Sequence, residues 1–254
     1  MRKMKKYYND DLAFIHDVGH GDFALKSAPG ILELLRRNHI REGLVVDLGC
    51  GSGIWAQHLT RAGYSVLGID ISEAMIAIAR KRAPDARFQV GSLFKARIPV
   101  CNAVTCIGEC INYLFDPVDE SRTLPRLFQR VYKSLAPGGL FIFDIVEPGQ
   151  VAEGAAIKSF SEGEDWTVLV EKSEDRARSI LTRRIISFRK LGQHYRRAVE
   201  VHRLRLYRSS DVARDLRLAG FVVKKMSGYG DYLFSKAHAS FVARKPARAE
   251  PENQ

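Results

Sequence analysis

The chain of 254 residues has a hydrophobic fraction of 46% and a charged fraction of 27%, as in an ordinary globular domain with a buried core. This composition excludes bulk disorder, and the length excludes a small module held together by disulfides or zinc. Lys and Arg number 40 against 29 Asp and Glu, a net charge of +11 that favours anionic partners without naming one.

The cysteines and the apolar segments bear on the compartment of the protein. The basic start at residues 1–6 runs into polar residues where a signal peptide would be apolar. Apolar stretches such as Leu140–Val146 are interrupted by Asp144 and are far shorter than the roughly 20 residues of a membrane helix. We therefore expect a soluble, cytoplasmic protein without membrane contact. The cysteines form neither a secreted disulfide framework nor a CxxC pair, and we predict no metal site: Cys50, Cys101, Cys106 and Cys110.

The first half of the chain alternates predicted strands and helices. After a polar and aromatic N-terminal stretch, apolar residues between basic ones predict an amphipathic helix over Leu25–Asn38. Ser72 is the expected N-cap of a later helix, with Glu73 in its first turn. The other elements are the strand Leu44–Leu48, a turn over Gly49–Gly53, the helix Ile54–Ala62, the strand Tyr64–Ile69 and short buried strands at Arg87–Val90 and Ala103–Ile107.

The second half begins with a helix over Arg122–Leu135 and the strand Leu140–Val146. The repeated βαβ order predicts a doubly wound α/β fold, with a mostly parallel seven-stranded sheet and helices on both faces. Residues 150–208 break this order, so we expect an antiparallel β insertion after the fifth strand. Its strands are Trp166–Val170, Ile180–Arg189 and Tyr195–Leu206, followed by a helix from Ser210 to Gly220, strands Phe221–Met226 and Ala239–Ala243, and a flexible tail over residues 245–254.

The turn Gly49-x-Gly51-x-Gly53 lies between a predicted strand and a helix, where glycines let the backbone approach a ligand and the helix offers free N–H groups. Asp47 precedes this turn and Asp70 ends the next strand. A strand-end carboxylate at Asp70 can accept hydrogen bonds from both ribose hydroxyls of a nucleoside. Asp47 would repel the pyrophosphate of a nicotinamide cofactor at the turn but would attract a ligand with an ammonium group.

Three segments resemble the successive motifs of the class I S-adenosylmethionine-dependent methyltransferases in order and spacing: Val45–Gly53, Gly68–Ser72 and Leu135–Leu140. The resemblance is good over residues 25–146 and looser over residues 209–244. It implies a single Rossmann-like methyltransferase domain over residues 1–254, an enzyme, and S-adenosyl-L-methionine as its cofactor. A nicotinamide enzyme and a cofactor-binding protein without catalysis are the alternatives.

The resemblance also implies the contacts with the cofactor. Asp47 and the glycine turn hold the methionine end, and Asp70 takes the ribose. Next to the adenine, Ile71 packs on the ring and the backbone N–H of Leu93 faces it. Ser92 occupies a position where the family frequently has an acid. At the end of the fourth strand, Cys106 and Ile107 either line the methionine or are only buried strand residues. The predicted set is Asp47, Gly49, Cys50, Gly51, Gly53, Asp70, Ile71, Ser92, Leu93, Cys106 and Ile107.

Methyl transfer from a sulfonium is an in-line displacement for which the protein supplies alignment, a dry site and, where needed, a base. In the loop after the fourth strand, Glu109 is the candidate that orients or deprotonates the acceptor, with Asn112 and Tyr113 as polar helpers. A solvated loop acid is the alternative for Glu109. Residues 1–38 are predicted to form an N-terminal helical lid, because the segment that holds His16 and His20 covers the cofactor in similar methyltransferases. Each histidine can serve as a base or stay at the surface. The predicted catalytic residues are Glu109, His20 and Tyr113.

The acceptor is predicted to be a small molecule, methylated on nitrogen or oxygen by a monomer or homodimer. The chain lacks the Asn/Asp-Pro-Pro-aromatic motif of nucleic-acid amino methyltransferases and a Pro-Cys pair for pyrimidine carbon methylation. We expect residues 150–208 to cap an acceptor with an anionic group, because guanidinium groups bind carboxylates and phosphates. The alternative is RNA or protein held on a solvated basic face. The basic residues concerned are Arg183, Arg184, Arg189, Lys190, Arg196, Arg197, Arg203, Arg205 and Arg208.

Overall fold

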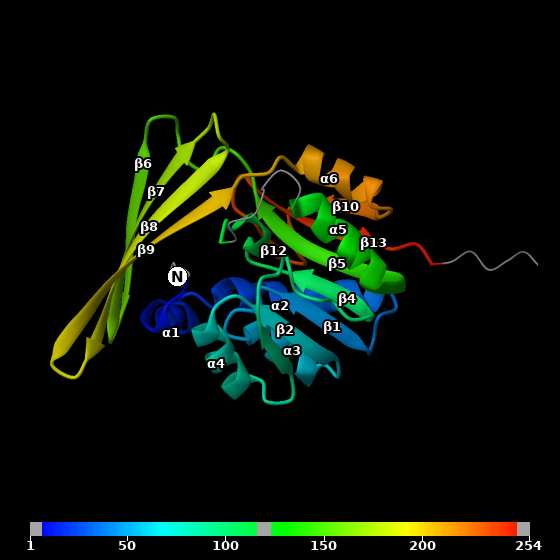
Figure 1. Ribbon diagram of the computed structural model, residues 1–254, viewed down its shortest axis with the longest axis horizontal. Coiled ribbons are helices and arrows are strands. Elements are labelled where there is room, and N and C mark those ends of the chain that lie inside the picture. The colour runs from blue at the N-terminus through cyan, green and yellow to red at the C-terminus, as the bar shows by residue number, and fades with distance from the viewer. Residues whose placement is uncertain (1–6, 116–122, 248–254) are drawn as a thin grey trace, which may run out of the picture.

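The computed structural model describes residues 7–115 and 123–247. A seven-stranded sheet has helices on both faces, and a separate four-stranded sheet stands beside it (Figure 1). Within the described residues, no helix is both long enough and apolar enough to cross a membrane. The predicted class, a mostly parallel α/β sheet with an antiparallel β insertion after its fifth strand, is confirmed.

The seven-stranded sheet has the order β10-β13-β5-β4-β1-β2-β3. Neighbours from β3 to β5 are parallel, whereas β13 is antiparallel to both β5 and β10. The carboxyl ends of β1, β2, β4 and β5 therefore lie at one edge, where ligands of such sheets bind. The strands are β1 (Leu44–Leu48), β2 (Ser65–Asp70), β3 (Arg87–Val90), β4 (Cys101–Cys106), β5 (Leu135–Val146), β10 (Val222–Met226) and β13 (His238–Arg244).

Helices bury their apolar stripes on the two faces of this sheet. Ile31 and Trp55 are at most 2% exposed on one face, and Phe128 and Leu216 are fully buried on the other. Burial of such side chains stabilises the domain by about 1.5–3 kcal/mol each. The helices are α1 (Asp10–Gly19), α2 (Asp22–Arg37), α3 (Ile54–Arg61), α4 (Glu73–Arg82), the 3₁₀ turn η1 (Cys110–Asn112), α5 (Thr123–Ser134) and α6 (Ser209–Leu218).

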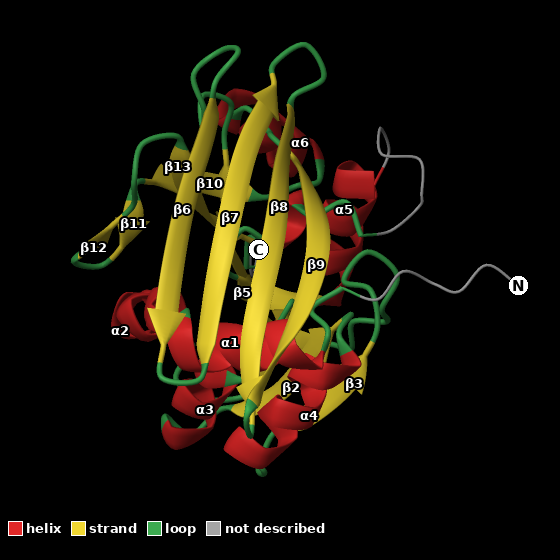
Figure 2. Ribbon diagram, turned by 90° about the vertical axis from the view of Figure 1, so that its left-hand side faces the viewer, coloured by secondary structure: helices red, strands yellow, loops and turns green. Residues whose placement is uncertain are grey.

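The four-stranded sheet forms the insertion, with the order β6-β7-β8-β9 and antiparallel neighbours throughout. Figure 2 shows its strands side by side, with α1 behind their lower part. Leu12 and Ile15 of α1 pack against Trp166, Val168 and Ile185 of the sheet. This contact fixes the inner face of the insertion, which comprises β6 (Ala156–Gly163), β7 (Trp166–Asp175), β8 (Ile180–Leu191) and β9 (His194–Arg205).

Several local predictions differ from the structure. The segment around His16 is the helix α1, and neither β6 nor the hairpin of β11 (Gly228–Tyr229) and β12 (Tyr232–Leu233) was predicted. Arg87–Val90 is not a buried strand, because β3 lies at the sheet edge with three of its four residues exposed. The strand predicted from Leu140 begins at Leu135, and the register irregularity between Cys101 and Ala103 accommodates the extra turn residues. The expectations for residues 1–6 and 248–254 lie outside the described residues.

Candidate active site

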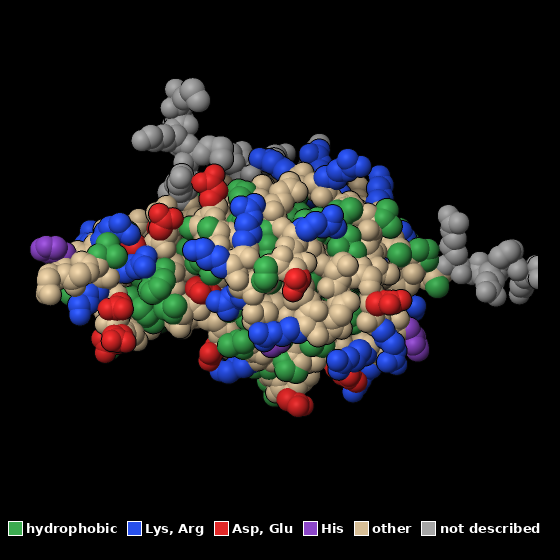
Figure 3. All heavy atoms as spheres, turned by 90° about the horizontal axis from the view of Figure 1, so that it is seen from below, with side chains coloured by type: hydrophobic (Ala, Val, Ile, Leu, Met, Phe, Trp, Pro, Cys, Tyr) green, Lys and Arg blue, Asp and Glu red, His purple; other side chains and the backbone are tan. Residues whose placement is uncertain are grey.

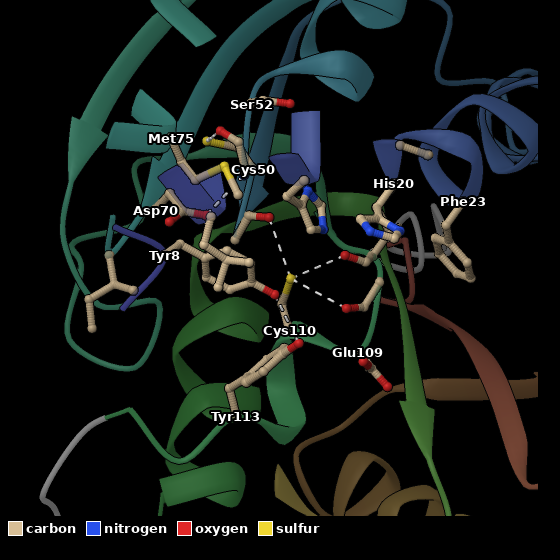
Figure 4. A pocket seen from close by; sticks show the side chains of 18 of the residues that line it. Tyr8, His20, Phe23, Cys50, Ser52, Asp70, Met75, Glu109, Cys110 and Tyr113 are labelled. Atoms are coloured by element: carbon tan, nitrogen blue, oxygen red, sulfur yellow. Dashed lines mark hydrogen bonds between the residues drawn. The ribbon is translucent and has the colours of Figure 1, made fainter. Parts of the chain in front are cut away.

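A cavity of about 640 Å³ lies between the carboxyl edge of the central sheet and the inner face of the insertion. Its walls come from the glycine turn, α1, the loop after β4, and strands β7 and β8. Figure 4 shows Asp70, Cys50 and Met75 on one side of the cavity and Glu109 and Tyr113 on another. Segments far apart in the sequence thus form one site.

The glycine turn approaches the cavity with little side-chain bulk. Gly49 has φ +75° and Gly51 has φ +52°, in the left-handed region that favours glycine. A Cβ atom on Gly51 would meet nothing within 4 Å, so this part of the turn faces open space. A Cβ atom on Gly53 would lie 2.9 Å from Cβ of Ala79. Gly53 therefore permits the close packing of α3 on α4 and does not line the cavity.

Asp47 is a buried carboxyl at the end of β1, only 1% exposed. Its Oδ1 atom accepts a hydrogen bond of 2.8 Å from Thr105 Oγ1, which in turn accepts one from Trp55 Nε1. Burial raises the pKa of Asp47 to about 7, and the charge of Asp70 adds to the effect. No lysine or arginine in the described parts of the chain forms an ion pair with it. Asp47 is thus ready for a cation from a ligand.

Asp70 ends β2 and holds two segments around the cavity. Its Oδ2 atom accepts from Gly51 N at 2.9 Å, and its Oδ1 atom accepts from Ser72 N at 2.8 Å. Burial raises the pKa of Asp70, and these backbone donors partly oppose that shift. Each carboxylate oxygen keeps further lone-pair capacity, so Asp70 can also accept the hydroxyl groups of a ribose.

The predicted adenine side has fixed backbone. Ser92 Oγ accepts from Phe94 N at 3.1 Å, and the carbonyl oxygens of Leu93 and Phe94 each accept from Arg130 at 2.7 Å. Ser92, Leu93 and Ile71 all line the cavity. Of the two residues predicted at the end of the fourth strand, Ile107 lines the cavity and Cys106 is fully buried behind it.

These features fit S-adenosylmethionine. Buried Asp47 and partly buried Asp70, neither with a cationic partner among the described residues, match an ammonium group and a diol, and the turn at Gly51 leaves room for the ligand backbone. The predicted contact residues that line the cavity are Asp47, Gly49, Cys50, Gly51, Asp70, Ile71, Ser92, Leu93 and Ile107.

The loop after β4 presents Glu109 to the other side of the cavity. Buried Asp144 accepts from the backbone N–H of Gly108 at 2.8 Å and of Glu109 at 2.7 Å. Glu109 has φ +56°, a conformation that this pair of hydrogen bonds holds in place. Its carboxylate forms a bidentate ion pair with Arg183 of β8, with Nη2 of Arg183 2.9 Å from Oε2. The acid is therefore paired and not a solvated loop residue.

Aromatic side chains adjoin this ion pair. The Tyr113 hydroxyl accepts from Arg183 Nη1 at 3.2 Å and lies 3.1 Å from the Tyr8 hydroxyl. Tyr113 stacks on Phe115 with ring centroids 4.6 Å apart. Burial raises the pKa of Tyr113 to about 12, so the phenol stays protonated and can donate or accept a hydrogen bond.

Two histidines of the N-terminal segment face the cavity. Burial lowers the pKa of His16 to about 4, and its Nδ1 atom has no partner among the described residues. His20, just after α1, is more exposed and lies 3.4 Å from Ser161 Oγ through Nε2. Burial also lowers the pKa of His20. Both rings are therefore predominantly neutral near pH 7.

Tyr8 and Asn9, near the start of the described chain, are hydrogen-bonded to both the insertion and the central domain. The backbone N–H groups of Tyr8 and Asn9 donate to Glu200 of β9 at 2.8 and 2.9 Å. Ser72 Oγ, the predicted and confirmed N-cap of α4, donates to the carbonyl of Tyr8 at 2.9 Å. One short segment thereby connects the insertion with the central domain.

Some site features were not predicted. Asn112, expected as a polar helper, is fully buried and bonds Val146 and the Arg205 carbonyl, so it joins the loop to β5 and β9. Lys172 and His238 line the cavity but were not singled out. The alternation of polar residues along β7 was the available signal for Lys172, since Lys172 shares a face with buried Val168.

The comparisons with known proteins agree with this geometry. A family model for a methyltransferase domain matches residues 45–139. A dTDP-3-amino-3,6-dideoxy-alpha-D-glucopyranose N,N-dimethyltransferase of Streptomyces fradiae is 26% identical, over 87% of this chain and 88% of that protein. A trans-aconitate 2-methyltransferase of Delftia acidovorans is 36% identical, over 51% of this chain and 48% of that protein. A putative methyltransferase of Geobacillus is 32% identical over 40% of this chain, and this chain spans 41% of the length of that protein.

Solved structures share the fold over nearly the whole chain. An S-adenosylmethionine-dependent methyltransferase of Clostridium acetobutylicum has a TM-score of 0.79 at 20% identity, covering 94% of this chain and 99% of that one. Streptomyces venezuelae DesVI has a TM-score of 0.77 at 23% identity, covering 94% of this chain and 100% of that one.

Residues 45–139 thus match a methyltransferase domain, and the chain is similar over most of its length to methyltransferases that use S-adenosylmethionine, as the sequence motifs predicted. It is therefore an enzyme that uses S-adenosylmethionine, and the nicotinamide alternative is set aside. The relatives that span most of the chain support methyl transfer to a small molecule over transfer to RNA or protein.

Proposed function

We propose that the protein transfers a methyl group from S-adenosylmethionine to the amino group of a small acceptor of the aminosugar kind that also carries an anionic group. The observation that carries this proposal is that Glu109 and Lys172 line the same cavity from different elements. A carboxylate attracts an amine, and an ammonium attracts a phosphate or carboxylate. One acceptor with both groups can satisfy both residues.

At the cofactor end, Asp47 receives the ammonium group and Asp70 the ribose hydroxyls. Ile71, Ser92 and Leu93 surround the adenine. The bound cofactor supplies a methyl group that is already activated on a sulfonium, so the protein has to bind, align and exclude water. The burial of Asp47 and the place of both carboxyls in the cavity wall support these assignments.

At the acceptor end, Glu109, Tyr113 and His20 contact the acceptor. Arg183 binds both oxygens of Glu109, which orients the carboxylate. Glu109 is therefore an orienting group for the amine. The N-terminal segment acts as the lid and residues 150–208 as the cap, in keeping with the bonds of Tyr8 to Glu200 and Ser72.

Lys172 is the proposed partner of the anionic group. It lies opposite Arg183 in the register of β7 and β8 and lines the cavity. Burial lowers the pKa of Lys172, and among the described residues it forms no hydrogen bond or ion pair. A partly desolvated ammonium without a partner gains more from an anion than a solvated one. The Streptomyces fradiae relative is named for a dTDP-linked aminosugar, in which phosphate is such an anion.

The outer face of the insertion offers less support for a polyanion. Arg203 and Arg184 point outward and are exposed, on the opposite side of the sheet from Arg183. On the underside of the molecule, which Figure 3 shows, Lys and Arg side chains are also scattered among acidic and apolar ones. A groove for RNA would instead gather basic and aromatic side chains along one path.

A carboxylate acceptor is the second candidate. The adjacent cations Lys172 and Arg183 favour it, as does the likeness to trans-aconitate 2-methyltransferases over half of the chain. In that case oxygen would be methylated and the product would be an ester. Because Arg183 is already paired with Glu109, Lys172 is the cation without an ion-pair partner in this part of the described cavity, which counts against a carboxylate held by both cations.

Acceptor panels decide between the two. The protein is incubated with S-adenosylmethionine and matched sugar nucleotides with an amino or a hydroxyl group, free aminosugars and small carboxylic acids. We expect mass gains of one and then two methyl groups on the amino sugar nucleotide, stable to alkali. Alkali-labile gains on carboxylic acids would support the ester alternative and overturn the amine proposal.

Lys172→Gln tests the anionic handle, with Lys190→Gln at an exposed position of β8 as the matched control. We expect K172Q to raise the Michaelis constant for the phosphorylated acceptor by about tenfold or more. The control K190Q should have the Michaelis constant of the wild type. Equal effects of both variants would contradict the role of Lys172.

A further inference from the structure

Asp144 is a fully buried carboxyl in β5 that serves two parts of the site. It accepts from the N–H groups of Gly108 and Glu109, from the Tyr229 hydroxyl at 3.2 Å, and has His238 Nε2 at 2.8 Å from its Oδ2 atom. His238 is therefore a hydrogen-bonding partner of a buried carboxyl that also holds the loop of Glu109.

His238 is the first residue of β13, at the same sheet edge as the cavity that it lines. Its ring stacks on Phe234 with centroids 4.2 Å apart and on Phe23 with centroids 5.6 Å apart. Because Nε2 faces Asp144, the neutral ring carries its proton on Nε2 and keeps the Nδ1 lone pair. Nδ1 has no hydrogen-bond partner among the described residues, and His238 is one of the residues that line the cavity.

We propose that His238, oriented by Asp144, is the group that accepts the proton from the acceptor amine during methyl transfer. This role rests on the proposed function. The amine nitrogen gives a proton to Nδ1 of His238, and its lone pair forms the bond to the methyl carbon. The electron pair of the broken carbon–sulfur bond stays on sulfur, and Asp144 stabilises the imidazolium.

The other cavity histidines suit this task less well. Burial lowers the pKa of His16 to about 4, which makes its imidazole a weak base. His20 has Ser161 as its hydrogen-bonding neighbour, at 3.4 Å. Among the histidines that line the cavity in the described part of the chain, His238 is the one bonded to a buried carboxylate. The same carboxylate also fixes the loop that carries Glu109, so acid orientation and proton acceptance share one support.

The tautomer is measured first, by ¹H–¹⁵N correlation of the imidazole nitrogens in the cofactor-free protein near pH 7.5, with H238Q to assign the signals. We expect a protonated Nε2 and an unprotonated Nδ1 for His238. A protonated Nδ1 with a free Nε2 would overturn the proposal, because no lone pair would then face the acceptor. This readout does not depend on an acceptor.

Kinetics follow with H238A, H238Q and the exposed-site control H194Q. Glutamine can still donate to Asp144 and keeps the fold testable if alanine does not. We expect kcat to fall by roughly 10²–10⁴ in H238A and H238Q, with unchanged affinity for S-adenosylhomocysteine. Added imidazole should restore part of the H238A rate but none in H238Q, whose side chain fills the space.

The outcomes are distinguishable from failure of the proposed function. A wild type that methylates no amine refutes the proposed function, whereas the tautomer still reports on the dyad. A wild type that methylates an amine, with H238Q within a few-fold of its rate and the same pH profile, would overturn the role of His238 alone.

Discussion

Glu109 and Arg183, 74 residues apart in the chain, form an ion pair that joins the loop after β4 to strand β8. Their side chains are 16% and 15% exposed, so the pair is mostly shielded from water. It therefore connects the central sheet with the insertion at the point where the acceptor is proposed to bind. The pair can act in both stability and catalysis, and the two roles can be separated.

A double-mutant cycle with Glu109→Gln and Arg183→Gln makes this separation. Each single change should lower the free energy of unfolding by about 1–3 kcal/mol, since the remaining charge is left without its partner. The double variant should recover part of that loss. Its activity should stay low, because E109Q alone is expected to lower kcat by roughly 10²–10⁴. Chemical denaturation and steady-state rates measure the two effects.

Cofactor affinity provides the control for this cycle. Calorimetry with S-adenosylhomocysteine should give wild-type affinity for E109Q. If kcat of E109Q remains within a few-fold of wild type, Glu109 is only a structural link between β4 and β8.

Asp47 predicts that cofactor binding releases a proton. Its pKa of about 7 means that part of the cofactor-free protein holds a protonated carboxyl near neutrality. An ammonium ligand favours the ionised form, so affinity should rise between about pH 6 and about pH 8. Titration calorimetry in buffers of different ionisation enthalpy measures the released proton. D47N should bind weakly and without proton release, and unchanged affinity for it would contradict the assignment.

The same shift affects stability in the opposite direction. Because the folded carboxyl has the higher pKa, its contribution to stability is greatest at acid pH and is lost as the pH rises through about 7. Asp47→Asn keeps an acceptor for Thr105 and should raise the stability of the cofactor-free protein at about pH 8, by at most about 4 kcal/mol. A melting temperature below that of wild type at this pH would be the contrary result.

Asp70→Ala should weaken S-adenosylhomocysteine binding by about 2–4 kcal/mol, because a charged acceptor for two hydroxyl groups is removed. Asp85→Ala, at an exposed position, is the matched control and should bind as wild type does. Since Asp70 also bonds Gly51 and Ser72, circular dichroism has to confirm that the variant is folded. Equal affinity of both variants would contradict the role of Asp70.

The parts of the fold and site that were predicted depend on short stretches of sequence. The strand, turn and acid from Leu44 to Gly53 lie within ten residues, and their geometry follows from glycine conformation and strand ends. Contacts such as Tyr8 with Glu200 and Asp144 with His238 depend on strand register over long separations. The hydrophobic period and the composition of a strand sequence do not determine such a register.

Residues 1–38 were expected to form a helical lid, but the bounds of helix α1 were not predicted, for a local reason. Asn9 makes no side-chain cap bond, and Gly19 and Gly21 follow closely in the sequence. The helix is stabilised by tertiary contacts instead, including those of Asp11 with Arg189 and Arg196 of the insertion. Packing against the insertion therefore stabilises this helix more than the helix propensity of its own residues does.

His16 should make stability depend on pH in the acid range. Its folded pKa of about 4 lies below the ordinary value of 6.5, so between these values the unfolded chain binds a proton that the folded chain does not. Stability should fall as the pH drops through this window, by at most about 3 kcal/mol. H16Q should show a flatter dependence in denaturant titrations, whereas H194Q should follow wild type.

Substitution of two arginines of the insertion can distinguish a small anionic acceptor from a polyanion. Arg183 faces the cavity, whereas Arg203 is exposed on the outer face, although the two positions lie on adjacent strands. R183Q should therefore change the Michaelis constant or the rate strongly, while R203Q should be silent at all salt concentrations. Binding to a diffuse polyanion surface would give small, equal losses in both variants and a steep decline of activity with salt. That pattern would refute a small-molecule acceptor beneath the insertion and favour a nucleic acid on its outer face.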